Sequence, residues 1–162
     1  MNSLKICLVC SHGGHLIEML KLTEAFKGHR VFLVTQKREY SVTLHDIHKV
    51  YLIPYLVPDF HHKYISRLFL LVEMIIETLF ELIILLKERP DIVISTGSEI
   101  AIPIFYMAKI LRKRVIFIES LCKVNELSSS AKLIYPIVDL LLVQWEPLLK
   151  RYSKAKYVGR VI

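Results

Sequence analysis

The sequence predicts a doubly wound α/β fold, in which helices cover both faces of a parallel β-sheet. Short β-branched apolar runs alternate along the chain with longer stretches of helical periodicity. Each short run is continuously apolar, which is typical of strands buried on both faces. The 162 residues suit one such unit, so we expect a single Rossmann-like domain over residues 1–162.

Seven segments are predicted as strands from their β-branched and apolar residues. They are residues 5–10, 30–35, 49–53, 91–95, 114–118, 139–144 and 156–158. Helical patterns separate them at residues 15–26, 66–88, 99–111, 131–135 and 146–152. Such sheets bind ligands at the carboxyl ends of their strands, where loops lead into helix N-termini. The loops at residues 11–15, 36–41, 96–99 and 119–130 are therefore the places to look for a site.

The composition indicates a folded domain with a basic balance of charge. Hydrophobic residues make up 54% of the chain and charged residues 23%, which excludes a disordered or collagen-like chain. The net charge of +7 suits anionic lipid, phosphorylated ligands or nucleic acid. We expect no nucleic-acid partner, because the basic residues are dispersed and no recognition motif accompanies them.

The three cysteines predict neither a disulfide framework nor a metal site. Cys7 and Cys10 form a C-x-x-C pair inside the first apolar run, and no second Cys or His pair has zinc-finger spacing. Buried strand thiols are therefore favoured, and no metal or other cofactor is expected. The N-terminus has no feature of a secretory signal, which predicts a cytoplasmic location.

The first candidate loop is Ser11-His12-Gly13-Gly14-His15, between a strand and an amphipathic helix. Adjacent glycines let the backbone approach a ligand, and a helix N-terminus favours an anion or phosphate. The spacing matches neither a dinucleotide fingerprint nor a P-loop. Either histidine could act as a general base toward a hydroxyl. The alternative is a plain glycine turn with a histidine at the helix start.

Two further loops carry small polar residues or a carboxylate. Thr96, Gly97 and Ser98 follow a buried strand; Thr96 or Ser98 could cap the next helix, or the three could leave room for a ligand. Glu119 ends another strand, where it could accept a hydroxyl proton or orient a sugar, and Lys123 could meet a phosphate. The alternative for the loop at residues 119–130 is a solvated connection that caps the helix near residue 131.

The helical segment at residues 66–88 is long enough to span a bilayer. Glu73, Glu77 and Glu81 align on one of its faces, and three mid-span carboxylates argue against a transmembrane helix. We expect a helix packed on the sheet or lying at a lipid interface. A basic and aromatic cluster at its start predicts membrane binding, with an ordinary loop as the alternative. The cluster is His61, His62, Lys63, Tyr64, Arg67, Leu68 and Phe69.

Taken together, these motifs resemble one family. The residues that carry the resemblance are 11–15, 95–98, 117–120, 127–136, Asp139, 143–145 and 158–160. The family is the accessory, membrane-recruiting subunit of split two-subunit glycosyltransferases. It includes the subunit that helps add the second N-acetylglucosamine to dolichol-linked sugar, and bacterial relatives that act in β-1,4-glycosyltransferases of capsule and exopolysaccharide synthesis.

The resemblance implies the N-terminal, acceptor-binding half of a GT-B glycosyltransferase, with the UDP-sugar half on a separate polypeptide. It implies that His15, or in competition Glu119, deprotonates the acceptor hydroxyl. Trp145, Tyr157, Gly159 and Arg160 are expected to contact the catalytic partner. The residues expected to bind the acceptor are Ser11, His12, Gly13, Gly14, Thr96, Gly97, Ser98, Ser120 and Lys123; the family often has Arg in place of Lys123.

We therefore expect a peripheral subunit on the cytoplasmic face of the cell membrane. It would bind a polyprenyl-diphosphate-linked sugar and dock a chain that carries the UDP-sugar. Eukaryotic members of the family have an N-terminal transmembrane anchor, whereas here the first strand begins at residue 5, so residues 60–86 or the partner would supply membrane contact. The alternatives are a non-catalytic membrane scaffold that stabilises the partner, and a free-standing small-molecule enzyme.

Overall fold

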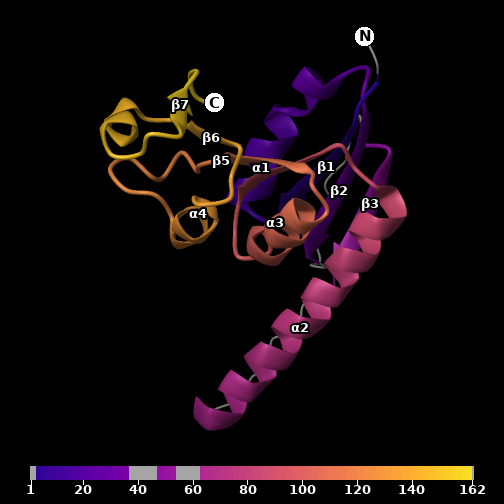
Figure 1. Ribbon diagram of the computed structural model, residues 1–162. Coiled ribbons are helices and arrows are strands. Elements are labelled where there is room, and N and C mark those ends of the chain that lie inside the picture. Colours follow the sequence, from indigo (N-terminus) through magenta and orange to yellow (C-terminus); the bar gives the residue numbers. More distant parts are fainter. Residues whose placement is uncertain (1–2, 37–46, 54–62, 162) are drawn as a thin grey trace.

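The structure is a computed structural model that describes residues 3–36, 47–53 and 63–161. Its centre is a seven-stranded sheet in the order β3-β2-β1-β4-β5-β6-β7, with every neighbouring pair parallel (Figure 1). This order reverses direction between β1 and β4, as in doubly wound folds. The strands are β1 (Lys5–Cys10), β2 (Arg30–Gln36), β3 (Lys49–Ile53), β4 (Ile92–Gly97), β5 (Arg114–Ile118), β6 (Leu140–Val143) and β7 (Ala155–Tyr157).

Helices cover both faces of this sheet. Helix α1 (Gly14–Lys21) packs through Leu16 and Met19 on one face, against alternate residues of β1, β2 and β4. The other face carries α2 (Lys63–Glu88), α3 (Ala101–Ile110) and α4 (Ser129–Ile134). The predicted doubly wound Rossmann-like fold is therefore confirmed.

Three predicted helices are shorter than their patterns indicate. The stretch predicted at residues 15–26 divides into α1 and a 3₁₀ turn, η1 (Thr23–Phe26). Thr23 donates its hydroxyl hydrogen to the carbonyl of Leu20, a bond that competes with continued α-helix. The segment at 146–152 is also a 3₁₀ helix, η2 (Glu146–Lys150), and α3 begins at Ala101 instead of residue 99.

The sheet alternates its side chains between the two cores. Cys7 lies in the core beneath α2, α3 and α4, whereas Cys10 lies in the core beneath α1. Both thiols are free and buried. Burial raises the pKa of the Cys10 thiol to about 12. The C-x-x-C pair is thus two separate core thiols on opposite faces of β1.

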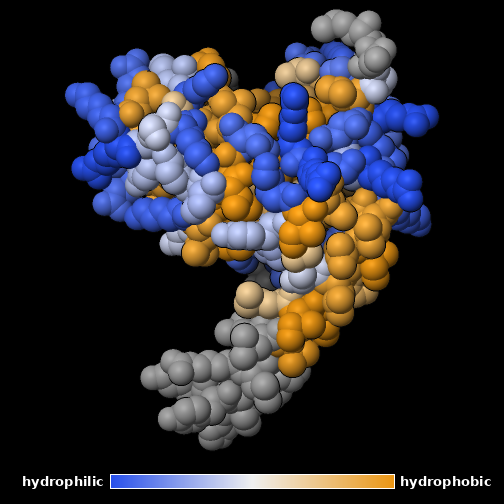
Figure 2. All heavy atoms as spheres, in the orientation of Figure 1, coloured by the Kyte–Doolittle hydropathy of each residue, from blue (hydrophilic) through white to orange (hydrophobic). Residues whose placement is uncertain are grey.

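Helix α2 departs from the usual orientation of an amphipathic helix. Its C-terminal turns pack on the sheet, while its N-terminal part extends away from the body toward the bottom of Figure 1. The inward face carries Glu77, which is 7% exposed, and Glu81, which is fully buried. The outward face is apolar along the helix and forms the orange band of Figure 2. Its exposed members are Val72, Ile75, Leu79, Phe80, Ile83 and Leu86.

The segment at 66–88 is expected either on the sheet or at a lipid interface; its C-terminal turns pack on the sheet, and Glu77 and Glu81 are buried there. Gln36, the last residue of β2, donates a hydrogen bond from Nε2 to Glu77 at 3.3 Å. Among the residues described here, no helix is long and apolar enough to cross a membrane.

Candidate functional site

The candidate site lies where the strand order reverses, at the carboxyl ends of β1 and β4. The loop after β1 holds Ser11, His12 and Gly13, and α1 follows immediately. The loop after β4 begins at Ser98 and leads into α3. Parallel strands bring both loops to the same edge of the sheet, which is where doubly wound folds bind ligands.

The two glycines of the first loop leave open space at the start of α1. Gly13, the N-cap residue, has φ +81°, a conformation that favours glycine. A Cβ atom built on either Gly13 or Gly14 would meet no heavy atom within 4 Å. A ligand could therefore approach the backbone N–H groups at this helix terminus closely.

His15 locks the two loops together. Its imidazole packs on Gly97, so closely that a Cβ atom at Gly97 would lie 2.5 Å from Cε1 of His15. Gly97 also has φ +132°. Thr96 donates its hydroxyl hydrogen to the main-chain carbonyl of His15 at 2.7 Å. The pair of loops thus requires glycine at position 97 for both conformation and space.

The hydrogen bond at Nδ1 fixes the state of the His15 ring. Nδ1 lies 3.0 Å from the carbonyl oxygen of Thr96. A carbonyl can only accept, so Nδ1 carries the hydrogen and, in the neutral ring, Nε2 has the free lone pair. No other described residue makes a hydrogen bond to Nε2. The ring therefore has the tautomer that a general base requires.

Neither Thr96 nor Ser98 caps helix α3, so the predicted capping role of these two residues is wrong. The helix has Ile100 at its N-cap and no side-chain cap. The hydroxyl of Thr96 bonds instead to His15, in the neighbouring loop. Ser98 is 9% exposed with φ +86°, and its Oγ has no hydrogen-bond partner among the described residues. Ser98 therefore combines backbone strain with an unused polar atom at the site.

Glu119 is buried and both of its carboxylate oxygens hold the loop that follows β5. One oxygen accepts the backbone N–H of Ser120 at 2.9 Å; the other accepts the backbone N–H of Ser128 at 2.7 Å and its hydroxyl at 3.1 Å. Burial raises the pKa of the Glu119 carboxyl in spite of these bonds. Ser128 in turn caps α4 by accepting the N–H of Ala131. This geometry makes Glu119 a positioning residue of the loop.

Glu18, one turn after His15 on α1, joins the site and was not predicted from the sequence. Its carboxylate accepts hydrogen bonds from the hydroxyl of Ser120 at 3.2 Å and the backbone N–H of Leu121 at 3.3 Å. Gln144, after β6, lies 3.4 Å from the second oxygen and also bonds to the Glu119 carbonyl at 3.0 Å. The i, i+3 spacing from His15 was the available signal, because it places Glu18 on the same helical face.

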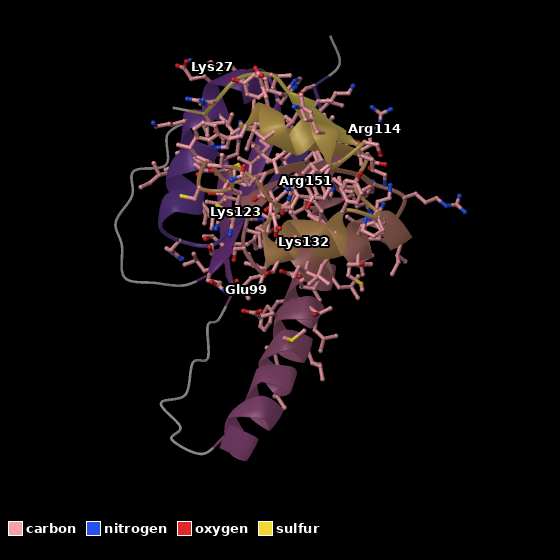
Figure 3. The ribbon with its side chains drawn as sticks, turned by 90° about the vertical axis from the view of Figure 1, so that its left-hand side faces the viewer. Lys27, Glu99, Arg114, Lys123, Lys132 and Arg151 are labelled. Carbon is pink, nitrogen blue, oxygen red and sulfur yellow. The ribbon has the colours of Figure 1, made fainter. Side chains whose placement is uncertain are left out.

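The remaining residues predicted to bind the acceptor lie on the loops after β1 and β5. Ser11 and His12 are half-buried, and Ser11 donates to the carbonyl of His12 at 3.4 Å. Lys123 is exposed on the loop after β5 (Figure 3). Its charge lowers the pKa of Glu119, although burial outweighs it. Lys123 therefore lies within electrostatic reach of the site.

The structure brings two of the predicted partner contacts together. The guanidinium of Arg160 stacks over the Trp145 ring at 3.9 Å, and Trp145 donates its indole hydrogen to the carbonyl of Leu121 at 2.6 Å. Gln144 accepts the backbone N–H of Val161 at 2.8 Å. Tyr157 ends the edge strand β7, and Gly159 is exposed two residues later. The C-terminal segment is therefore attached to the loop that Glu119 organises.

The side chains of the predicted membrane-binding cluster are not placed. His61 and His62 are outside the described residues. Residues 63–71 are described only as part of helix α2, so the side chains of Lys63, Tyr64, Arg67, Leu68 and Phe69 are not placed. Within the described ranges, no group of three or more His, Cys, Asp or Glu residues is arranged to hold a metal ion.

A family model described as "Oligosaccharide biosynthesis protein Alg14 like" matches residues 6–161, nearly the whole chain. The chain belongs to the Alg14-like family. The resemblance seen in the sequence is thereby confirmed at the level of this family. The matched range includes the His15–Gly97 pair, the Glu119 loop and the Trp145–Arg160 stack.

Alg14-like relatives from several eukaryotes are similar to this chain. The rat protein named "UDP-N-acetylglucosamine transferase subunit ALG14" is 25% identical over 186 aligned positions, which cover 99% of this chain and 84% of the relative. The Candida albicans protein of the same name is 38% identical over 90 residues, covering 52% of this chain and 41% of the relative. The match therefore spans less than half of the yeast relative.

Solved structures confirm the fold of this Alg14-like chain. MurG from Acinetobacter baumannii has a TM-score of 0.67 at 14% identity, over 89% of this chain and 42% of that chain. A UDP-N-acetylglucosamine 2-epimerase from Rickettsia bellii has a TM-score of 0.69 at 14% identity, over 99% and 46%. The chain thus corresponds to one Rossmann-like half of such two-domain molecules, as predicted for the N-terminal half of a GT-B glycosyltransferase.

Proposed function

We propose that this chain is the acceptor-binding, accessory subunit of a two-subunit glycosyltransferase whose catalytic partner holds a UDP-sugar. Its relatives are named as subunits of a UDP-N-acetylglucosamine transferase. The chain covers 42% of MurG from Acinetobacter baumannii, and in this proposal the partner subunit supplies a second Rossmann-like half. The acceptor would be a polyprenyl-diphosphate-linked sugar, whose phosphates suit the open N-terminus of α1.

The observation that carries this proposal is the arrangement of His15. The carbonyl of Thr96 orients the imidazole through Nδ1, the ring packs against Gly97, and Nε2 keeps its lone pair. Open space lies at the Cβ positions of Gly13 and Gly14, the two residues before His15. A base with a fixed tautomer beside an anion-binding helix terminus suits activation of a hydroxyl on a phosphate-linked sugar.

The reaction is an inverting displacement. The acceptor hydroxyl oxygen forms a bond to C1 of the donor sugar, while the bond between C1 and the UDP oxygen breaks. His15 Nε2 takes the hydroxyl proton, and UDP leaves with the bonding electron pair on the partner subunit. Lys123 and the first N–H groups of α1 would hold the acceptor phosphates. Inversion at an α-linked donor gives a β-linkage, in agreement with a β-1,4-transferase of oligosaccharide, capsule or exopolysaccharide synthesis.

The decisive experiment replaces His15 in the two-subunit enzyme. Membranes containing this chain, the candidate catalytic chain, or both are assayed with UDP-N-acetylglucosamine, UDP-glucose and UDP-galactose on a lipid-linked acceptor. Transfer should require the pair, and both His15→Ala and His15→Gln should reduce it by about 10²-fold or more, since general-base catalysis contributes roughly 10²–10⁴-fold. Lys113→Ala, away from the site, is the control.

Two outcomes would change the proposal. Near wild-type transfer by both His15 variants, with normal partner association, would leave the non-catalytic scaffold as the function. Robust transfer by this chain alone would instead show that it holds its own nucleotide site.

We also propose that α2 attaches the subunit peripherally to the cytoplasmic face of a membrane. The outward apolar face of α2 supports this location, because Ile75, Leu79 and Ile83 are each more than half exposed. An apolar helix face of this size suits the boundary between lipid headgroups and acyl chains. The basic and aromatic cluster that precedes it in the sequence would add attraction to anionic lipid.

A further inference from the structure

A second concave site lies at the amino ends of the strands, at the other end of the sheet from His15. A pocket of about 480 Å³ is lined by Lys27, His29, Arg30 and His48, with Phe26 and Ile47 as its apolar residues. Ser3 and Gly28 complete the described lining, which contains no carboxylate. Lys27 and Glu99, a residue of the loop after β4, lie at opposite ends of the body in Figure 3. The pocket is therefore separate from the proposed acceptor site.

The two histidines of this pocket have a defined tautomer. Nδ1 of His29 accepts the backbone N–H of Leu4 at 3.3 Å, and Nδ1 of His48 accepts the backbone N–H of Val31 at 3.2 Å. A ring nitrogen that accepts cannot carry the hydrogen, so each neutral ring carries it on Nε2. Both rings are thus donors at the nitrogen that is not tied to the backbone.

A neighbouring pocket adds positive charge. It shares Arg30 and His48 with the first pocket and is also lined by Lys5 and Lys49. The one carboxylate in its described lining, Glu88, is paired with Lys5 at 2.6 Å and with Lys49 at 2.9 Å. The acidic residue is therefore neutralised locally, and Arg30 faces the shared edge of both pockets without an ion pair among the described residues.

We propose that this pocket binds a soluble, phosphate-bearing anion of the diphosphate class. Arg30 supplies charge-assisted hydrogen bonds, and the two imidazoles supply neutral N–H donors, which together suit several phosphate oxygens. Lys27, whose ammonium is 3.1 Å from Glu24, adds positive charge at the surface of the pocket. The volume falls in the range of small-molecule sites, and Phe26 and Ile47 offer contact for an apolar part of the ligand. A soluble ligand fits because the N-terminal end of the chain, where Ser3 lines the pocket, lies opposite the projecting N-terminal part of α2 (Figure 1).

The test titrates inorganic pyrophosphate into the full chain and follows binding by NMR and calorimetry. We expect shifts of the His29 and His48 ring nitrogens and of the Gly28 amide. Arg30→Gln should weaken binding about tenfold or more, because it removes a charge-assisted hydrogen bond to phosphate. His48→Asn keeps an acceptor for the Val31 N–H but removes the Nε2 donor, and should weaken binding without unfolding the chain.

Arg114→Gln is the matched control, because Arg114 is the exposed first residue of β5, just as Arg30 is the exposed first residue of β2. It should bind pyrophosphate like the wild type. Shifts confined to the Gly13 and Gly14 amides would overturn the proposal, since the anion would then occupy the acceptor site. Arg30-dependent binding to phosphatidic acid vesicles without binding of pyrophosphate would overturn it too, since the ligand would then be a lipid headgroup.

Discussion

At the scale of single residues, Gly97 controls the position of the proposed base. A side chain at this position meets the His15 ring at 2.5 Å and must adopt φ +132°. Gly97→Ala should therefore displace the imidazole and lower transfer by the subunit pair roughly a hundredfold, as misplacement by about 1 Å can do. The backbone strain should also destabilise the fold by about 1–3 kcal/mol. Transfer assays and urea denaturation measure the two effects.

Gly28→Ala is a control that introduces backbone strain without displacing the His15 ring. Gly28 has φ +86°, but a Cβ atom there meets nothing within 4 Å. This variant should lose comparable stability and retain transfer. Equal loss of transfer in the two variants would show that the contact with His15 is unimportant.

Glu81 should make stability depend on pH. Burial raises the pKa of its carboxyl well above 4.5, the nearby Glu77 charge adds to the rise, and neither oxygen has a hydrogen-bond partner among the described residues. The folded state therefore holds the proton more tightly than the unfolded state. The resulting stabilisation is complete below about pH 4.5 and is lost as pH rises through the folded pKa.

Glu81→Gln tests this dependence, because glutamine cannot titrate. The variant should be more stable than the wild type at neutral pH, and its free energy of unfolding should fall less between pH 4 and pH 8 (roughly the range over which such groups titrate). The exposed Glu99 provides the control, Glu99→Gln. An unchanged pH profile in Glu81→Gln would mean that the carboxyl is ionised in the folded chain.

The sequence predicted which loops meet at one edge of the sheet, but not the contacts between their residues. His15, Gly97 and Glu119 were each predicted from loops that follow buried strands. The packing of His15 on Gly97 depends on the parallel register of β1 with β4, which no local pattern shows. Glu18 was missed because a carboxylate on a short amphipathic helix is most often solvated.

At the scale of elements, α2 buries two carboxylates beside the apolar Ile84 and Leu85 and leaves an apolar face exposed, which is unusual for an amphipathic helix. The sequence predicted the alignment of Glu73, Glu77 and Glu81 on one face. It did not decide which face turns inward, because hydrophobic patterning normally places the apolar face on the core. The structure turns the acidic face inward and ties it to β2 through Gln36.

The outward face of α2 gives a prediction for membrane binding. Ile75→Asp combined with Leu79→Asp should abolish most flotation with anionic vesicles, since each charge on the apolar face costs on the order of 2 kcal/mol or more in lipid. Ile110→Asp on α3, where the side chain is 72% exposed, is the matched control and should float like the wild type. Unchanged flotation of the double variant would exclude this face as the membrane contact.

At the scale of the whole molecule, β7 is an edge strand of the sheet, and the residues proposed to contact the partner subunit lie near it. The exposed Arg160 stacks on the half-buried Trp145, shortly after β7 in the chain. Arg160→Glu should weaken association with the catalytic chain about tenfold or more, because Trp and Arg pairs dominate many interfaces. Affinity pull-down and calorimetry measure this, with the exposed Arg112→Glu as the control. Full association of Arg160→Glu would place the interface elsewhere.

The architecture was the most predictable level. Continuous apolar runs predicted all seven strands, and their alternation with helical patterns predicted a doubly wound sheet. The short 3₁₀ helices were not predicted, because hydrophobic periodicity does not distinguish them from α-helix over a single turn. The predicted strand ends at residue 95, whereas β4 continues to Gly97, because Thr96 and Gly97 have the composition of a turn although Gly97 pairs with Cys10 in the sheet.

The reciprocal bonds between His15 and Thr96 have a consequence for the timing of assembly. The imidazole is oriented when the chain folds, because its partner is the main chain of a central strand. The conformational entropy of that side chain is therefore lost before any acceptor arrives. Binding then does not have to order the base, and a preorganised group of this kind lets more of the interaction energy with the acceptor appear as affinity and rate.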